Sequence, residues 1–303
     1  MSSSATYQIK HQTTYRYSGD VVHSHQLLHL TPRESSRQTC LSHYVSIQPG
    51  PTHSTSDVDA FGNPVLRLEF DRQHQSLDVI AEMSVEVHSV ADRVLKSEAW
   101  ERVRSGLTYS GRPVGGERLE AMRFRAESPH ARIKQVLTDY AAPCFPAGRS
   151  VIDCADHLMH KLYDEMSYAP GETSVSTSLL EVLEKRRGVC QDYAHLMIGC
   201  LRSRGLAARY VSGYLRTIPA AGEKALVGAD ASHAWVAVYC PVSGWVEYDP
   251  TNGVRADTDH ITVAWGRDFS DVSPLRGVIV GGGQHQLSVS VSVVPIAAST
   301  EPA

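Results

Sequence analysis

Long apolar runs are missing from this chain of 303 residues. A membrane-spanning helix needs about 18 or more consecutive apolar residues, and no segment of the sequence approaches that length. Residues 1–10 contain neither the basic n-region nor the apolar h-region of an export signal. We therefore expect a soluble, cytoplasmic protein that is neither exported nor bound to a membrane.

The chain also lacks a large excess of positive or negative charge. The chain has 29 Lys and Arg against 33 Asp and Glu, a net charge of −4, without a polybasic stretch. Nucleic acids and anionic lipid surfaces select proteins with clustered Lys and Arg, so neither is expected as a partner. The run Gly281-Gly282-Gly283 lacks the Gly-Lys-Ser/Thr ending of a phosphate-binding loop and predicts a turn.

The six cysteines include no Cys-x-x-Cys pair, which argues against a zinc ribbon or a thioredoxin-like motif. They stand at positions 40, 144, 154, 190, 200 and 240. Without an export signal, reduced thiols are expected. Cys200 and Cys240 are predicted to be small buried side chains, one on a helix and the other on a strand.

Histidine is plentiful, with 15 in the chain, but its pattern does not predict a metal site. His23 and His25 would share one face of a strand, and His29 follows closely. No nearby Cys or carboxylate in the sequence completes a ligand set. We therefore predict a solvated sheet face and no bound metal.

One stretch, residues 188–196, combines a reactive residue type with the start of a helix. The apolar residues after Cys190 recur with helical spacing: Ala194, Met197, Ile198 and Leu201. Gly205 stands where a C′ glycine would end that helix. Unpaired N–H groups at a helix start stabilise a thiolate, the nucleophilic form of cysteine. Gly188 allows a sharp turn beside the sulfur, so Cys190 is the predicted nucleophile.

A thiolate needs a base, and the base needs a group that orients it. Residues 230–240 and 244–250 both read as strands and are joined by a short turn, which predicts an antiparallel hairpin. A three-residue loop would set Asp249 opposite Trp235 and make His233 its diagonal neighbour. Diagonal pairs lie about 7–8 Å apart, within reach of an imidazole and a carboxylate. His233 is thus the predicted base and Asp249 its orienting partner.

Three sequence blocks resemble the transglutaminase-like superfamily of papain-type cysteine enzymes, and more narrowly its bacterial members with a β-rich N-terminal region. They are Gly-Val-Cys-Gln-Asp-Tyr-Ala-His at 188–195, Ser-His-Ala-Trp at 232–235 and Gly-Trp-Val-Glu-Tyr-Asp-Pro-Thr-Asn at 244–252. All three stand in the family's order. The resemblance implies a catalytic triad of Cys190, His233 and Asp249, acyl-enzyme chemistry on amides, and no cofactor.

The predicted fold class is α+β with two domains. Short strands and turns over residues 1–95 predict a β-sandwich-like N-terminal domain, with Ser18-Gly19-Asp20 ending its first strand. Residues 96–127 read as an irregular connection. Residues 128–303 would form the transglutaminase-like catalytic domain, whose nucleophile helix packs on an antiparallel sheet.

Within the catalytic region, capping signals and apolar spacing predict helices over 128–140, 151–166 and 179–186, the first with Ser128 as N-cap and Pro129 at N1. A strand is expected over 207–218 and another over 286–296. The loop 219–228, rich in Ala and Gly, is the expected mobile segment beside the site.

Four further residues are candidates for the oxyanion hole or for substrate contacts: Gln191, Tyr168, Trp235 and Arg267. The backbone N–H of Cys190 is the first natural oxyanion donor. Asp192 and His195 are assigned structural roles. A carboxylate beside Cys190 would oppose the thiolate, so Asp192 should point away or pair with an Arg, and His195 falls on another helix face.

The leading function is hydrolysis of a peptide or isopeptide bond in a peptide or protein substrate. The same triad serves transamidation between a glutamine and an amine, and a non-catalytic binding module that retains the fold is the third reading. An acyltransferase that uses a thioester donor stays open, as does assembly into a homo-oligomer.

Overall fold

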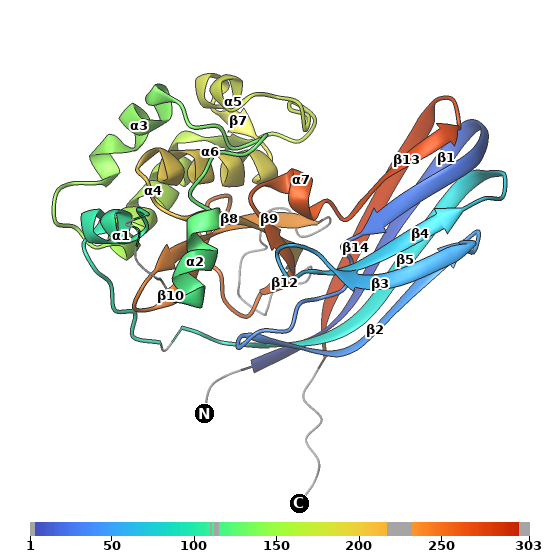
Figure 1. The fold of residues 1–303 in the computed structure, drawn as a ribbon, viewed down its shortest axis with the longest axis horizontal. Helices are drawn as coiled ribbons and strands as arrows, with labels where there is room; N and C mark the ends of the chain where they lie inside the picture. The colour runs from blue at the N-terminus through green and yellow to red at the C-terminus, as the bar shows by residue number, and fades with distance from the viewer. Residues whose placement is uncertain (1–3, 92, 110, 112–114, 217–231, 297–303) are drawn as a thin grey trace, which may run out of the picture.

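The computed structural model describes residues 4–91, 93–109, 111, 115–216 and 232–296. Figure 1 shows a lobe of helices around a small sheet beside a lobe built from long strands. Within the described ranges, no helix is both long and apolar enough to cross a membrane.

The strand lobe is one antiparallel sheet of seven strands: β1 (Ser4–Leu28), β2 (Gln38–Gln48), β3 (His53–Val58), β4 (Pro64–Phe70), β5 (His74–His88), β13 (Leu275–Gly281) and β14 (His285–Ile296). β1 is its organising element. The first half of β1 pairs with β5 and β14, and its second half pairs with β4 and β13. β2 pairs with β5, and β3 pairs with β4.

β1 runs through the turn expected at Ser18-Gly19-Asp20, which is a correction to the sequence prediction. The register to β5 shifts between Arg16 and Val21, so the turn-forming residues are absorbed as an irregularity within the strand. Strand partners along β1 supply backbone hydrogen bonds that outweigh the local turn preference.

The strands expected to form a sandwich make a single seven-stranded sheet, and its buried side chains share a core with the other lobe. Tyr7 and Ile9 on β1 are buried in the same core as Tyr214 and Ile261 of the other lobe. The Tyr214 hydroxyl also lies 3.0 Å from His11 Nδ1. One continuous core therefore joins the two lobes.

The predicted domain limits differ from the structure at two places. Residues 275–296, assigned to the catalytic domain, return to the first sheet as β13 and β14. The supposed connection 96–127 contains two short helices, α1 (Trp100–Gly106) and α2 (Gly116–Arg123). Apolar side chains drive both differences, because Trp100, Val103 and Val293 are buried.

The helical lobe contains these further helical elements: α3 (Gln135–Ala141), η1 (Ala142–Cys144), α4 (Val151–Glu165), α5 (Leu179–Lys185), α6 (Cys190–Ser203) and α7 (Phe269–Val272). The predictions for α4 and α5 are confirmed, with Ser150 and Ser178 as N-caps. The helix predicted from Ser128 begins only at Gln135, because the Ser128 hydroxyl accepts a hydrogen bond from the buried Arg202.

A sheet of five strands supports the helices, in the order β11 (Val254–Arg255), β10 (Gly244–Asp249), β9 (His233–Cys240), β8 (Ala208–Leu215) and β12 (His260–Gly266). α6 packs against β8 and β9. A short parallel pair, β6 (Ser167–Tyr168) and β7 (Arg187–Gly188), leads into α6. The predicted mobile loop 219–228 lies outside the described residues.

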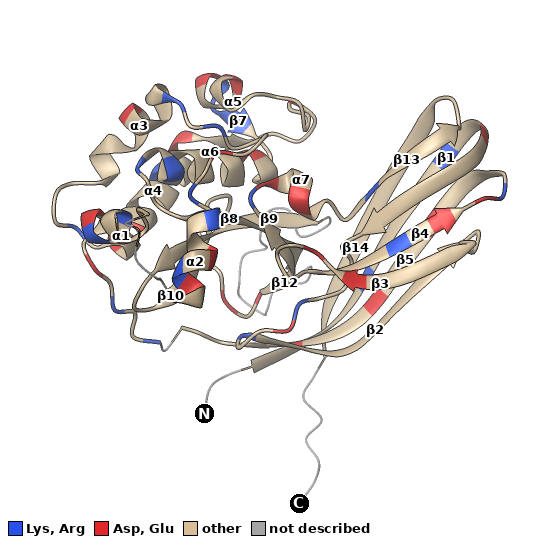
Figure 2. Cartoon of the chain, in the orientation of Figure 1, with Lys and Arg blue, Asp and Glu red and all other residues tan. Residues whose placement is uncertain are grey.

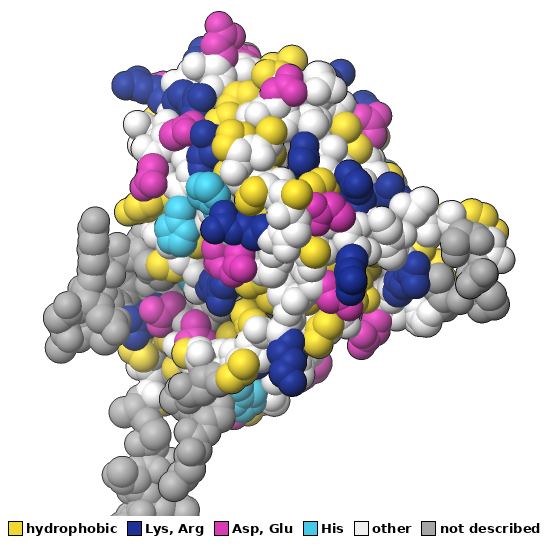
Figure 3. Space-filling model, turned by 90° about the vertical axis from the view of Figure 1, so that its left-hand side faces the viewer, with side chains coloured by type: hydrophobic (Ala, Val, Ile, Leu, Met, Phe, Trp, Pro, Cys, Tyr) yellow, Lys and Arg dark blue, Asp and Glu magenta, His cyan; other side chains and the backbone are white. Residues whose placement is uncertain are grey.

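Charged residues of both signs are spread along the chain in both lobes (Figure 2). On the face that Figure 3 shows, basic and acidic side chains alternate rather than gathering by sign. Ion pairs on the helical lobe include those of Arg187 with Glu172 and of Lys185 with Glu181. The face in view therefore has no extended basic patch.

Candidate active site

Cys190 is the first residue of α6, as predicted, and its side chain is half-buried. Val189 is the N-cap, and its N–H donates to Asp192 Oδ2 at 2.8 Å. Gly205 ends the helix with φ +77°. The sulfur therefore stands at the positive end of a buried, regularly formed helix.

Asp192 does not pair with an Arg, as the sequence had allowed. Its Oδ2 accepts the Val189 N–H and the Thr173 hydroxyl, the latter at 2.6 Å. Burial raises the pKa of Asp192, and the two hydrogen bonds oppose that rise. Asp192 thus closes the helix start instead of acting on substrate.

Gly188 is required by this carboxylate. A Cβ at Gly188 would lie 2.6 Å from Asp192 Oδ2, too close for any side chain. Space for Asp192, more than space for the sulfur, explains the glycine. Tyr168 pairs with Gly188 across the β6–β7 ladder, which brings this candidate residue beside the helix start.

The hairpin of β9 and β10 has the predicted register. Gly244 pairs with Cys240 and Tyr248 with Val236, so Asp249 is the next residue, opposite Trp235. His233 Nε2 lies 2.9 Å from Asp249 Oδ2, and both side chains are fully buried. The three-residue loop thus sets the register that brings the imidazole and the carboxylate together.

His233 is held as a cation by its surroundings. Burial lowers its pKa, but the negative charges of Asp249 and Cys190 outweigh burial and raise the pKa of His233 to about 10. Among the described residues, no group forms a hydrogen bond with His233 Nδ1. Nε2 is therefore committed to Asp249, and Nδ1 is the nitrogen left for Cys190.

Asp249 is the most heavily bonded group of the site. Its oxygens accept from His233, from His260 Nε2 at 3.1 Å and from the side chain of Asn252 at 2.7 Å. The backbone N–H groups of Thr251 and Asn252 add two more bonds. Burial would raise the pKa of Asp249, yet the cationic His233 and these donors hold it far below its usual range. Asp249 is therefore ionised.

His260 is the site residue that sequence reasoning missed. It begins β12, is 3% exposed and shares Asp249 Oδ2 with His233. In the sequence, its only distinguishing feature is its position at the start of the β-prone run of residues 260–266. β10 and β12 are separated in the sheet by β9 and β8, so periodicity gives no hint that the two residues meet.

Trp235 supports His233 from behind and has no surface for substrate. Its side chain is fully buried, its ring centroid is 6.2 Å from that of His233, and its indole N–H donates to Glu247 at 2.8 Å. Gly213 makes room for it, because a Cβ there would lie 2.6 Å from the indole ring.

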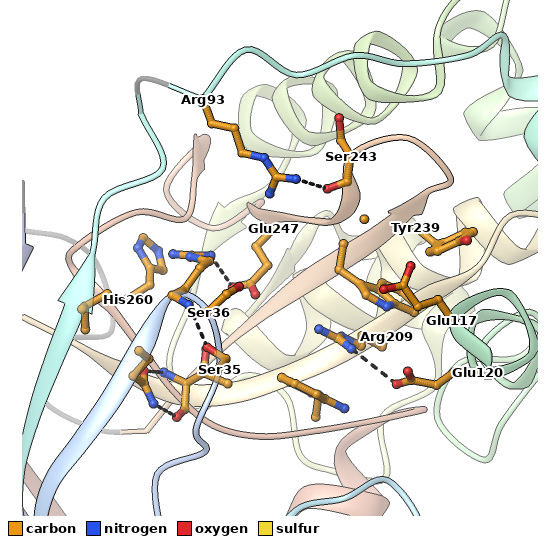
Figure 4. A pocket seen from close by; sticks show the side chains of 17 residues that line it. Ser35, Ser36, Arg93, Glu117, Glu120, Arg209, Tyr239, Ser243, Glu247 and His260 are labelled. Atoms are coloured by element: carbon orange, nitrogen blue, oxygen red, sulfur yellow. Dashed lines mark hydrogen bonds and ion pairs between the residues drawn. The ribbon is translucent and has the colours of Figure 1, made fainter. Parts of the chain in front are cut away.

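A cavity of about 350 Å³ lies beyond this support (Figure 4). Its wall contains His260 and Glu247, and Arg37 forms an ion pair with Glu247 at 3.0 Å. Arg209, also in the wall, is stacked between Trp245 and Trp265. Cys190, His233 and Asp249 do not line this cavity, so it lies behind the triad and is not the place of its substrate.

The remaining candidates differ in how they are held. Arg267 forms a double hydrogen bond with Asp271, which fits a structural ion pair better than a substrate contact. Gln191 is half-buried in the first turn of α6. His195 stacks on His130 and accepts the Phe269 N–H, and burial lowers its pKa to about 3. Its structural role is as predicted.

All six cysteines are free thiols. Cys200 and Cys240 are buried on α6 and β9, as expected. Burial raises the pKa of Cys154 to about 12 and also raises that of Cys144. Of the six, Cys190 alone adjoins a cationic imidazole at a helix start.

Comparison with known proteins assigns both parts of the chain. Residues 7–86 match the bacterial transglutaminase-like N-terminal region, and residues 139–250 match the transglutaminase-like superfamily. An uncharacterized protein of Mycobacterium tuberculosis H37Rv is 36% identical over 304 residues, 97% of this chain and 94% of that protein. An uncharacterized protein of Mycobacterium leprae is 34% identical over 295 residues, covering 96% and 99% of the two chains.

Two other matches bear on fold and chemistry. A solved structure from Cytophaga hutchinsonii, described as a candidate cysteine protease, aligns with a TM-score of 0.75 at 19% identity over 99% of this chain and 94% of its own. It shows a shared fold. A protein-glutamine gamma-glutamyltransferase of Pseudomonas aeruginosa is 39% identical over 77 residues, only 25% of this chain and 12% of that protein.

Proposed function

The chain belongs to the transglutaminase-like superfamily, and on that basis we propose that it is a cysteine-dependent hydrolase of amide bonds in peptides or proteins. Cys190 is the nucleophile, His233 the general acid and base, and Asp249 the group that orients His233. The observation that carries the proposal is the fully buried bond of 2.9 Å between His233 Nε2 and Asp249 Oδ2, next to a cysteine at a helix start.

The resting site places a protonated His233 beside Cys190. A pKa of about 10 keeps His233 protonated at neutral pH, and the ionised Asp249 balances its charge. The start of α6 stabilises the negative sulfur of Cys190. A cationic imidazole and a helix start are both surroundings that favour the thiolate form of a cysteine.

The reaction proceeds through a thioester. Cys190 Sγ attacks the amide carbonyl carbon, and the C–N bond breaks as His233 donates its proton to the leaving amine. Water then loses a proton to His233 and attacks the thioester, which releases the carboxylic acid and restores the pair. The Cys190 N–H at the first helical turn is one donor to the oxyanion, and Tyr168 or Gln191 is the proposed second.

Transamidation is the second candidate, and the short match to the Pseudomonas aeruginosa gamma-glutamyltransferase favours keeping it. The first half-reaction is identical up to the thioester. An amine then replaces water as the attacking group. A non-catalytic module would have no use for an ionised, buried Asp249.

The nucleophile is tested by the rate at which iodoacetamide alkylates each cysteine, followed by mass spectrometry near pH 6. We expect Cys190 to react far faster than the other five thiols, since an ordinary thiol with a pKa of about 8.5 is mostly protonated there. His233→Ala should remove the advantage, whereas His88→Ala, which alters a half-exposed histidine of the other lobe, should not. Equal rates for Cys190 and the buried thiols would overturn the proposal.

Hydrolysis and transamidation are separated by product analysis. A peptide library is incubated with and without a primary amine, and Cys190→Ala serves as the blank. Release of acid in both conditions supports the hydrolase, and products that appear only with amine support transamidation. No turnover above the blank, with Cys190 still selectively alkylated, would identify the proposed reaction class as wrong while leaving the nucleophile intact.

A further inference from the structure

Three potential metal ligands converge on the outer face of the first sheet. One nitrogen of His23, one of His25 and one carboxylate oxygen of Glu69 all lie within 4.8 Å of one another. The two Nε2 atoms are 2.8 Å apart, and His25 Nε2 is 3.8 Å from Glu69 Oε1. No other group of three such residues is found in the described part of the chain.

Strand pairing explains why the sequence did not show this set. His23 and His25 alternate with buried Ser24 on β1, so both imidazoles stand on the outer face. Glu69 comes from β4 and is the direct partner of His25 in the ladder. The carboxylate that the sequence lacked near the histidines is thus supplied 44 positions later by the fold.

A second carboxylate prepares His23 for a metal. Asp71 Oδ1 lies 2.7 Å from His23 Nδ1, so Nδ1 carries the proton that Asp71 accepts. In the neutral ring the lone pair is then on Nε2, the atom that faces His25. A carboxylate behind a ligating histidine is the usual arrangement that fixes the tautomer in metal sites.

We propose that His23, His25 and Glu69 bind a divalent transition metal such as Zn²⁺, with Asp71 as the positioning residue. Two imidazoles and one carboxylate are a known zinc ligand set that leaves a fourth position for water. Nitrogen donors favour Zn²⁺ over Mg²⁺ and Ca²⁺, which prefer oxygen alone. The site is independent of the proposed amide hydrolysis.

The neighbouring charges allow a cation there. Glu69 and Asp71 bring two negative charges, and both side chains keep contact with solvent. Arg67, two positions from Glu69, lies 3.6 Å from Asp57 and is engaged by it. The guanidinium of Arg276 donates to the Ser270 carbonyl. The nearby positive charges therefore have partners of their own.

The test is isothermal titration of untagged full-length protein with Zn²⁺ near neutral pH, carried out in Cys190→Ala to remove the thiolate as a competing ligand. We expect one Zn²⁺ per chain. His25→Asn and Glu69→Gln should each weaken binding at least tenfold, and Asp71→Asn about tenfold. His88→Asn, a half-exposed histidine of the same sheet, should leave binding unchanged, and Mg²⁺ should not compete.

The imidazole nitrogens give a second readout that is independent of affinity. In a ¹⁵N NMR titration of the histidines, Zn²⁺ should shift the Nε2 resonances of His23 and His25 and spare those of His88. Circular dichroism of each variant confirms that the sheet is intact. Absence of stoichiometric binding, or binding that survives His25→Asn and Glu69→Gln in folded protein, would overturn the proposal. So would Zn²⁺ binding that is lost in Cys190→Ala.

Discussion

Each of the two sheets pairs histidines with carboxylates, but in opposite environments. In the second sheet, His233 and Asp249 are fully buried, and the pKa of His233 rises to about 10. In the first sheet, His23 and Asp71 lie at a similar distance, yet their side chains are 39% and 47% exposed. Water screens the exposed pair and not the buried one.

The comparison shows that burial, more than residue type, decides what a histidine–carboxylate pair can do. Burial of the pair in the five-stranded sheet keeps His233 protonated beside Cys190. Exposure leaves the pair of the first sheet open to a ligand from solution. The same two side chains thus suit catalysis in one sheet and metal binding in the other.

The largest expected effect comes from neutralising the buried carboxylate. Asp249→Asn keeps the shape of the side chain but removes the charge that fixes His233, so kcat/KM should fall on the order of 10⁴-fold. Steady-state hydrolysis of a peptide found in the library screen measures this, with circular dichroism to confirm folding. Activity within tenfold of the parent protein would show that Asp249 does not orient the base.

The pH dependence of unfolding should separate the buried pair from the exposed one. The pKa of His233 is about 10 when folded and about 6.5 when unfolded. Its stabilising contribution is therefore complete below about pH 6.5 and is lost as pH rises through about 10, a fall on the order of a few kcal/mol. Urea unfolding across this range measures the slope.

Asp249→Asn is the matched variant for that measurement. Without the carboxylate, the pKa of His233 should return toward its ordinary value, and the slope between neutral and alkaline pH should flatten. An unchanged slope in the variant would mean that other groups cause the pH dependence.

A smaller effect is expected from His260, which bonds the same oxygen of Asp249 as His233 does. His260→Phe keeps a ring of similar size but removes the donor, so kcat/KM should fall about 10- to 100-fold, the effect of one lost bond to a charged group. His260→Gln, which can still donate, should recover part of the loss. Equal activities of the two variants would argue that only the packing of His260 matters.

The smallest effect belongs to the exposed pair. In metal-free protein, Asp71→Asn should change the free energy of unfolding by less than about 1 kcal/mol, as for most surface ion pairs. Urea unfolding with a chelator present measures it. A loss comparable to that of Asp249→Asn would contradict the role given to solvent screening.

Local sequence signals predicted the core of the candidate site. The apolar spacing after Cys190 predicted α6, and the three-residue loop predicted the register that joins His233 to Asp249. Both features arise from short-range geometry, in which helix periodicity and hairpin length leave few alternatives.

The features that were missed all depend on contacts distant in sequence. Glu69 reaches His25 only because β4 pairs with β1, and His260 reaches Asp249 across two intervening strands. Residues 275–296 were assigned to the catalytic domain but pair with β1, since an alternating strand carries no mark of its partner. Trp235 is of a residue type common in binding sites, but its indole N–H donates to Glu247.

The return of β14 to β1 has a consequence for how the protein is made. Tyr7 pairs with Pro295 and Tyr17 with His285, so β1 stays without one of its neighbours until the ribosome has also made residues 285–296. Contacts of such high sequence separation slow folding, and an unpaired edge invites association with other chains. Removing residues 285–296 would expose this edge of β1 permanently. A strand of another chain could then pair with β1 in place of β14 and cause misassembly.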